Sequence, residues 1–116
     1  MNKSRLAHST GLAGEEIALR YLLSQGYRHV QSRYRTQRGE IDLILWQGDT
    51  LVFVEVKYRR HGLPGEGLAA INAAKLQRWT EACAEYLCTH DLSCPVRLDV
   101  VEITPAGIEH VENVSI

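Results

Sequence analysis

Two short apolar segments, residues 40–46 and 51–58, follow each other with only four residues between them. Both are rich in Ile, Leu, Val and aromatic residues, a composition that favours β-strands. The intervening residues include Gly48, and glycine tolerates the positive φ that tight hairpin turns require. The sequence therefore predicts an antiparallel hairpin in which Gln47 lies opposite Thr50.

The predicted register decides which side chains of this hairpin face each other. Counting from the turn, Asp42 lies opposite Glu55, and Glu40 lies opposite Lys57. Strand alternation predicts a wholly apolar face made of Ile41, Leu43, Leu45, Val52, Val54 and Val56. The other face is apolar near the turn and carries the charged side chains at its far end.

Asp42 and Glu55 are like charges in directly opposed positions. Side chains so placed have Cβ atoms about 5 Å apart, where like charges are destabilising. At an effective dielectric constant of about 20 the repulsion is on the order of 3 kcal/mol, a sizeable part of a domain's net stability. A divalent cation between the two carboxylates would compensate it. Hard oxygen ligands suit Mg²⁺ or Mn²⁺.

Helical spacing and turn residues divide the rest of the chain. Apolar residues at helical spacing predict helices over residues 11–25 and 68–87, the first capped by Ser9 or Thr10. Further strands are predicted over residues 27–35, 96–103 and 108–114. We therefore expect one α/β domain over residues 1–116, with a mixed sheet of about five strands flanked by helices in the order αβββαββ. Residues 1–10 and the glycine-rich loop 61–67 are expected to be flexible.

Three more charged side chains are candidates for a site around the opposed acids. Lys57, on the same face as Glu55, is placed to orient a water molecule or to stabilise charge on a phosphate. Glu15, on the edge of the first helix's apolar stripe, offers another carboxylate, and Lys75 offers a cation from the second helix. Each also has a structural interpretation, as counter-ion, helix-edge acid or lysine with a buried stem.

The net charge of −1 hides an uneven distribution along the chain. Residues 1–60 carry ten basic and six acidic side chains, and residues 61–116 carry three and eight. The near-neutral total argues against an indiscriminate polyanion binder. Five arginines nevertheless cluster around the strand ends of the predicted site: Arg33, Arg35, Arg38, Arg59 and Arg60. Such side chains bind phosphates without reading bases.

The chain has three cysteines and no apolar segment behind its N-terminal charges that would indicate a secretory signal. No apolar run approaches the roughly 18 residues of a membrane-spanning helix. We therefore expect free thiols and a cytoplasmic location. Cys88, His90 and Cys94 lack the paired spacing of structural zinc sites, which disfavours zinc there.

The charged hairpin also carries a resemblance to known nucleases. Gly39-Glu-Ile-Asp42-Leu-Ile, followed by Leu51-Val-Phe-Val-Glu55-Val-Lys57, is similar to the core of the PD-(D/E)xK nuclease superfamily, in which an Asp precedes an E-x-K on the next strand. More closely, the chain resembles the bacterial YraN family, which is related to archaeal Holliday-junction resolvases. Supporting matches are Gly11-x-x-Gly14-Glu15-x-x-Ala18, Tyr21-Leu22, Gly26-Tyr27, Lys75 and Arg97-Leu-Asp99-Val-Val101.

This resemblance implies a restriction-endonuclease-like core and metal-dependent hydrolysis of DNA phosphodiesters, with branched or structured DNA among the substrates. Asp42, Glu55 and Glu15 would hold Mg²⁺ or Mn²⁺, and Lys57 would be the catalytic lysine. The five arginines and Lys75 would bind the DNA, and resolvase-like members usually act as homodimers.

Two other interpretations remain open. The chain can be a nucleic-acid-binding or assembly module that keeps the nuclease fold without turnover. Alternatively, Asp42 and Glu55 can be a structural pair held by Lys57 and Arg59 alone.

Overall fold

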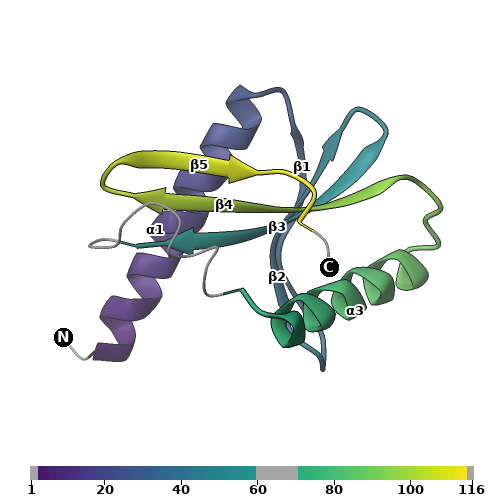
Figure 1. Ribbon diagram of the computed structural model, residues 1–116, viewed down its shortest axis with the longest axis horizontal. Coiled ribbons are helices and arrows are strands. Elements are labelled where there is room, and N and C mark those ends of the chain that lie inside the picture. The colour runs from purple at the N-terminus through teal and green to yellow at the C-terminus, as the bar shows by residue number, and fades with distance from the viewer. Residues whose placement is uncertain (1–2, 60–70, 115–116) are drawn as a thin grey trace.

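A computed structural model describes residues 3–59 and 71–114, with side chains from residue 13 onward (Figure 1). Its elements are α1 (Lys3–Ser24), β1 (Arg28–Arg35), β2 (Glu40–Gln47), β3 (Thr50–Tyr58), α3 (Ala73–Thr89), β4 (Val96–Thr104) and β5 (Gly107–Val111). They confirm the predicted mixed α/β fold and the order αβββαββ. No helix in this part of the chain is long and apolar enough to cross a membrane.

The five strands form one mixed sheet in the order β1-β2-β3-β4-β5. Neighbouring strands are antiparallel except for β3 and β4, which are parallel. A parallel pair needs a crossover connection, and here α3 lies between the two strands in the chain. The β2–β3 hairpin therefore occupies the middle of the sheet, as expected from its apolar composition.

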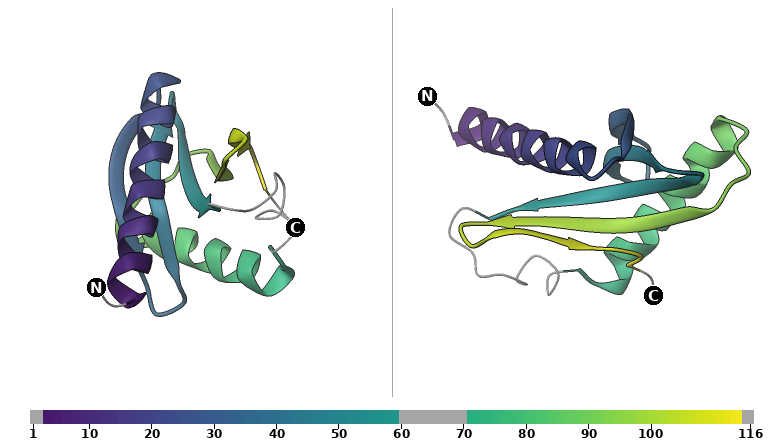
Figure 2. Two further views of the ribbon diagram at one scale, coloured as in Figure 1. Left: turned by 90° about the vertical axis from the view of Figure 1, so that its left-hand side faces the viewer. Right: turned by 90° about the horizontal axis from the view of Figure 1, so that it is seen from above.

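The two helices cover opposite faces of the sheet (Figure 2). On one face, Ala18 and Leu22 of α1 pack against Leu43, Leu45, Val52 and Val54. On the other face, α3 contributes Leu76, Trp79, Ala82, Cys83 and Tyr86, which pack against Ile44, Leu51 and Phe53. Both faces of the central hairpin are thus buried, and polar groups on it must find partners inside the protein.

Both helices begin at residues other than those predicted. Helix α1 begins at Lys3 instead of residue 11, so Ser9 and Thr10 lie inside it instead of capping it, and residues 3–10 are helical where we expected a flexible segment. No proline interrupts this stretch. Helix α3 begins at Ala73, because the Asn72 side chain accepts a hydrogen bond from the Lys75 amide and caps it. The predicted loop 61–67 lies outside the described residues.

The strict alternation predicted for β2 is wrong at one position. Leu43 packs on the α1 side of the sheet, whereas Ile41 packs on the α3 side, although the two residues were predicted to share a face. Asp42 between them has no backbone partner on β1 or β3 among the described pairs. Opposite it on β1, Arg33 has a φ of 55°, in the left-handed region. This interruption of the ladder turns the start of β2 and breaks the period of two.

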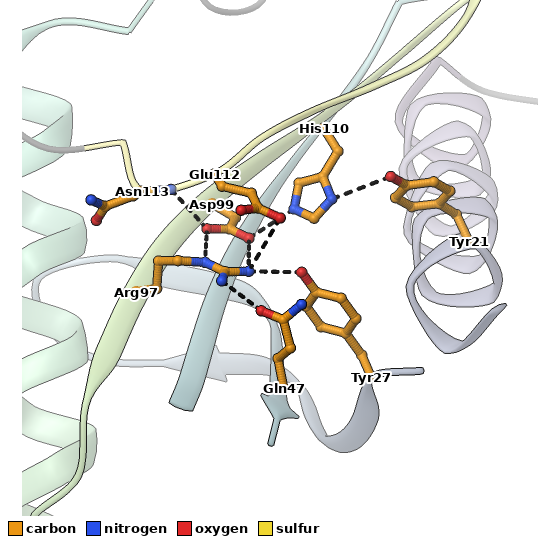
Figure 3. A network of polar contacts seen from close by, with 8 residues as sticks. All are labelled: Tyr21, Tyr27, Gln47, Arg97, Asp99, His110, Glu112 and Asn113. Atoms are coloured by element: carbon orange, nitrogen blue, oxygen red, sulfur yellow. Dashed lines mark hydrogen bonds and ion pairs between the residues drawn. The ribbon is translucent and has the colours of Figure 1, made fainter. Parts of the chain in front are cut away.

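A buried polar network ties the last two strands to the first helix (Figure 3). Asp99 on β4 is fully buried and accepts two hydrogen bonds from the Arg97 guanidinium, both 2.8 Å long. Its carboxylate also accepts from His110 Nε2 at 2.7 Å and from the Asn113 amide at 3.0 Å. The other nitrogen of His110, Nδ1, lies 3.3 Å from the Tyr21 hydroxyl of α1.

Arg97 extends this network toward the hairpin turn. It donates to the Tyr27 hydroxyl at 2.7 Å and to Gln47 Oε1 at 2.6 Å. Burial acts to raise the pKa of Asp99, but the hydrogen bonds from His110, Arg97 and Asn113 outweigh it and hold the pKa below its ordinary value. Asp99 is therefore a charged group in a fully satisfied setting.

Candidate functional site

Four carboxylates gather where β2 begins and β3 ends, remote from the hairpin turn. We call Glu15, Glu40, Asp42 and Glu55 the acid cluster. Glu15, Glu40 and Asp42 each offer an oxygen within 4.8 Å of the others. Glu55 is joined to Asp42 by a hydrogen bond between the two carboxyl groups. The structure therefore brings together the three acids that the sequence singled out.

The β2–β3 hairpin positions two of these acids. The observed pairs run from Gln47 opposite Thr50 to Leu43 opposite Val54, which confirms the predicted register over that stretch. Backbone pairing then gives way to a side-chain contact, because Asp42 Oδ2 accepts a hydrogen bond of 2.8 Å from the Val56 amide. The position of this carboxylate is therefore fixed by the backbone of the strand that carries Glu55.

Helix α1 delivers Glu15 through a close approach to β3. A Cβ atom on Gly14 would lie 2.7 Å from Cβ of Tyr58, so only glycine fits at this contact. The next residue, Glu15, then reaches the acid cluster, where its Oε2 lies 2.8 Å from Nε of Arg33. Glycine in mid-helix is unfavourable by about 1 kcal/mol relative to Ala, and the close packing of the helix on the strand explains its presence.

Burial and mutual repulsion raise the pKa values of the two central acids of the cluster, Asp42 and Glu55. Burial raises the pKa of Asp42, and the nearby charges of Glu15 and Glu40 add to this effect against the opposing hydrogen bond from Val56. Burial also raises the pKa of Glu55, and the charge of Asp42 raises it further against the influence of Lys57. The raised pKa values of the two carboxyl groups favour a proton shared between them.

Lys57 lies between the acid cluster and α3. Its Nζ atom is 3.6 Å from Oε1 of Glu55 and 5.6 Å from the ring centroid of Trp79. A cation over an aromatic face is favourable, most of all for tryptophan. Trp79 belongs to the buried core on the α3 side of the sheet, and no local sequence pattern indicates that its ring also lies near the head of Lys57.

The predicted DNA-binding residues do not all lie at the acid cluster. Arg33 and Arg35 lie at the acid cluster, where Arg33 pairs with Glu15 and Arg35 Nε lies 3.6 Å from Oε2 of Glu40. Arg38 instead pairs with Glu81 of α3 at 3.0 Å. Three further predicted residues complete the set. Lys75 is half-buried at the start of α3, Arg59 is half-buried just after β3, and Arg60 lies outside the described residues.

The residues present fit a hard divalent cation. All four donors are carboxylates, the ligand type that Mg²⁺ and Mn²⁺ prefer. Oxygens bound to one octahedral Mg²⁺ lie about 3 to 4 Å apart, so the group within 4.8 Å needs only a small contraction to meet an ion. Asp42 belongs to this group and contacts Glu55, so it is central to any such site.

Sequence reasoning missed two acids near the site. Glu40 was assigned only as a charged neighbour of Lys57, because its proximity to Glu15 depends on how α1 packs. Glu102 of β4 is 1% exposed and lies beside Lys57 in the parallel β3–β4 pairing. Neither position was visible from local spacing, although Glu102 stands out as an acid within the apolar run Val100 to Ile103.

The mixed five-stranded sheet with its two helices is consistent with the restriction-endonuclease-like core that the resemblance implied. The chain belongs to the uncharacterised protein family UPF0102, whose characteristic sequence pattern matches residues 14–103. The matched residues include the whole acid cluster and Lys57.

Curated relatives in this family cover most of the chain. A UPF0102 protein of Chromohalobacter salexigens is 42% identical over 103 residues, which are 89% of this chain and 84% of the relative. UPF0102 proteins of Methylococcus capsulatus and Thermotoga neapolitana are each 40% identical, over 84% and 86% of this chain and over 80% and 92% of their own lengths. The YraN-like assignment is thereby confirmed at the level of the family.

Proposed function

We propose that this protein is a metal-dependent endonuclease that hydrolyses DNA phosphodiesters, with branched DNA among its substrates. The observation that carries the proposal is the pair of half-buried acids, Asp42 and Glu55, whose pKa values are raised beside a lysine at the end of an E-x-K strand. Buried carboxyl groups with perturbed pKa values cluster at functional sites. A purely structural pair would need no such costly repulsion.

Asp42 and Glu55 would hold Mg²⁺ or Mn²⁺, with Glu15 and Glu40 completing the set of oxygens. When bound, the ion supplies charge stabilisation at the phosphate oxygens. Hydrolysis forms a bond from the water oxygen to phosphorus and breaks the bond from phosphorus to a sugar oxygen, which takes up a proton. Lys57 would hold the water or neutralise charge on the phosphate, and the contacts of its head with Trp79 and Glu55 support this role.

Cleavage assays on a panel of DNAs test the proposal. Linear duplex, nicked, flapped and four-way-junction DNA are incubated with the full chain in Mg²⁺, in Mn²⁺ and in chelator. We expect metal-dependent cleavage of at least one substrate, a loss of metal binding in Asp42→Asn, and a rate loss of about 10²-fold or more in Lys57→Ala. The exposed acid variant Glu16→Gln, outside the cluster, serves as the control and retains activity.

Two outcomes contradict the proposal. Absence of both binding and cleavage on every DNA, in either metal, excludes a nuclease. DNA binding without cleavage that is unchanged in Asp42→Asn and Lys57→Ala indicates the alternative, a nucleic-acid-binding or assembly module that keeps the fold.

A further inference from the structure

Two arginines on β1 act as counter-ions for the outer members of the acid cluster. Arg33 Nε lies 2.8 Å from Glu15 Oε2, and these side chains are 33% and 18% exposed. Arg35 pairs more loosely with Glu40 at 3.6 Å, and its side chain is 79% exposed. Among the described ion pairs, Glu15 and Glu40 are therefore the members of the cluster that pair with arginines, whereas Glu55 pairs with Lys57.

The backbone of Arg33 is held in an uncommon conformation. Its φ of 55° lies in the left-handed region, which costs a non-glycine residue on the order of 1 kcal/mol or more. This conformation occurs opposite Asp42, where the ladder on both sides of β2 is interrupted. Strain of this kind persists only where surrounding contacts over-determine it, and here it accompanies the contact between Arg33 and Glu15.

The charges of this neighbourhood are nearly balanced before any metal binds. With every group ionised, the four carboxylates of the acid cluster meet three cations, namely Lys57, Arg33 and Arg35. One divalent ion would change the net formal charge of this set from −1 to +1. The arginines are then in excess, and the same groups that neutralised Glu15 and Glu40 can neutralise phosphate oxygens instead.

We infer that Arg33 and Arg35 exchange partners between the acid cluster and DNA phosphates, which couples metal binding to DNA binding. In the metal-free protein they pair with Glu15 and Glu40. When Glu15 and Glu40 hold metal, the guanidinium groups of Arg33 and Arg35 would instead present their N–H donors to the phosphate backbone beside the site. This inference rests on the proposed function, since it assigns a regulation to the same site.

Coupling of this kind is reciprocal. If metal raises the affinity for DNA by some factor, DNA must raise the affinity for metal by the same factor. Arg33 has the shorter and more buried ion pair, so we expect it to contribute most of the coupling between metal binding and DNA binding. Removal of Arg33 frees Glu15 in the metal-free state, so metal should bind more tightly, while DNA loses a phosphate contact and should bind more weakly. The two effects have opposite signs.

Calorimetric titration of Mn²⁺ into the full chain at low temperature, with and without a four-way-junction DNA whose phosphorothioate linkages resist hydrolysis, measures the coupling directly. Arg33→Ala should bind Mn²⁺ about two- to fivefold more tightly than the parent protein, the range of a partly exposed ion pair. Its DNA affinity in Mn²⁺ should fall, with the slope of log K against log salt reduced by about one. Arg35→Gln should show the same signs with smaller changes.

Arg20→Ala is the matched control, because Arg20 also pairs with a glutamate of α1, Glu16, but on the exposed face of the helix. It should leave both affinities unchanged. Weaker Mn²⁺ binding in Arg33→Ala, or an unchanged coupling factor, overturns the exchange while leaving a parent protein that binds metal and DNA. If the parent protein binds neither, the proposed function itself fails, so the two failures are distinguished. Melting temperatures of all variants confirm that each is folded.

Discussion

Asp42 accepts a hydrogen bond from the backbone amide of Val56 at the point where backbone pairing between β2 and β3 ends. A carboxylate thus replaces a carbonyl as the last acceptor of the ladder. The contact satisfies the Val56 amide inside the sheet, and it holds the Asp42 carboxylate within the acid cluster. Asparagine keeps the acceptor and loses the charge, which makes it an informative substitution.

Asp42→Asn should abolish stabilisation by Mg²⁺ without unfolding the protein. We expect the parent protein to gain stability with added Mg²⁺, because a ligand that binds the folded state shifts the unfolding equilibrium. Melting curves in chelator and in excess Mg²⁺ measure the shift. The variant should melt at or above the parent's temperature in chelator, since a buried repulsion is removed, and should show no shift with metal. A persistent shift would place the ion elsewhere.

The metal-free protein should lose stability as pH rises from about 4 to about 8. Asp42 and Glu55 have raised pKa values in the folded state. In the unfolded state their pKa values are about 4, so the folded state keeps protons that the unfolded state releases. This contribution is complete below the unfolded values and is lost as pH passes the folded ones. Urea unfolding in chelator at a series of pH values measures it.

Glu55→Gln should flatten this pH dependence. Asp99 has a lowered pKa and contributes the opposite slope, but only at pH values below its unfolded value of about 4, so the two effects separate. Stability that stays level or increases between about pH 5 and about pH 8 in the parent protein would contradict the electrostatic description of the acid cluster.

Gly14→Ala should destabilise the protein and impair the site together. The added Cβ would lie 2.7 Å from Tyr58 Cβ, next to the backbone of β3, so the helix must move away. Overpacking of this kind costs about 1–3 kcal/mol, of which the better helix preference of Ala offsets about 1 kcal/mol. Gly39→Ala is the control, because nothing lies within 4 Å of its added Cβ. Urea unfolding and Mn²⁺ titration of both variants should show losses only in Gly14→Ala.

Asp99→Asn should be among the most destabilising single substitutions in this chain. It removes the fully buried and nearer of the two charged partners of Arg97, and breaking a buried ion pair costs about 3–5 kcal/mol. Glu112→Gln, which removes a 55% exposed partner 3.8 Å from Arg97, should cost less than about 1 kcal/mol. Comparable losses in the two variants would show that the buried Asp99 contributes no more to stability than the exposed Glu112.

The sequence predicted the element order and the hairpin register because both depend on local rules. The turn around Gly48 fixes which residues oppose each other, and the period of two assigns most side chains to a face. The same rules failed at Ile41. The face of the sheet on which Ile41 lies is set by the break in backbone pairing at Asp42 and by the positive φ of Arg33. No sequence pattern around these two residues predicts either feature.

The remaining parts of the site depend on contacts between distant segments. Glu40 joins Glu15 only because α1 packs against the sheet, and Arg38 pairs with Glu81, 43 residues later, instead of staying free for phosphates. Glu102 lies beside Lys57 through a crossover that brings β4 next to β3. Spacing along the chain carries no information about such pairs, so these contacts could be identified only from the structure.

The network around Asp99 links residues that are made at very different times during synthesis. The Tyr21 hydroxyl and His110 are 89 positions apart, and Arg97 and Tyr27 are 70 apart. Every member of the acid cluster, and Lys57, has been synthesised by residue 57, yet a nascent chain that ends before β5 leaves a buried aspartate without its histidine and its Asn113 amide. The groups proposed for phosphodiester hydrolysis are therefore present in the chain before β5 completes the network around Asp99. A truncated chain carries these groups without a stable framework to align them.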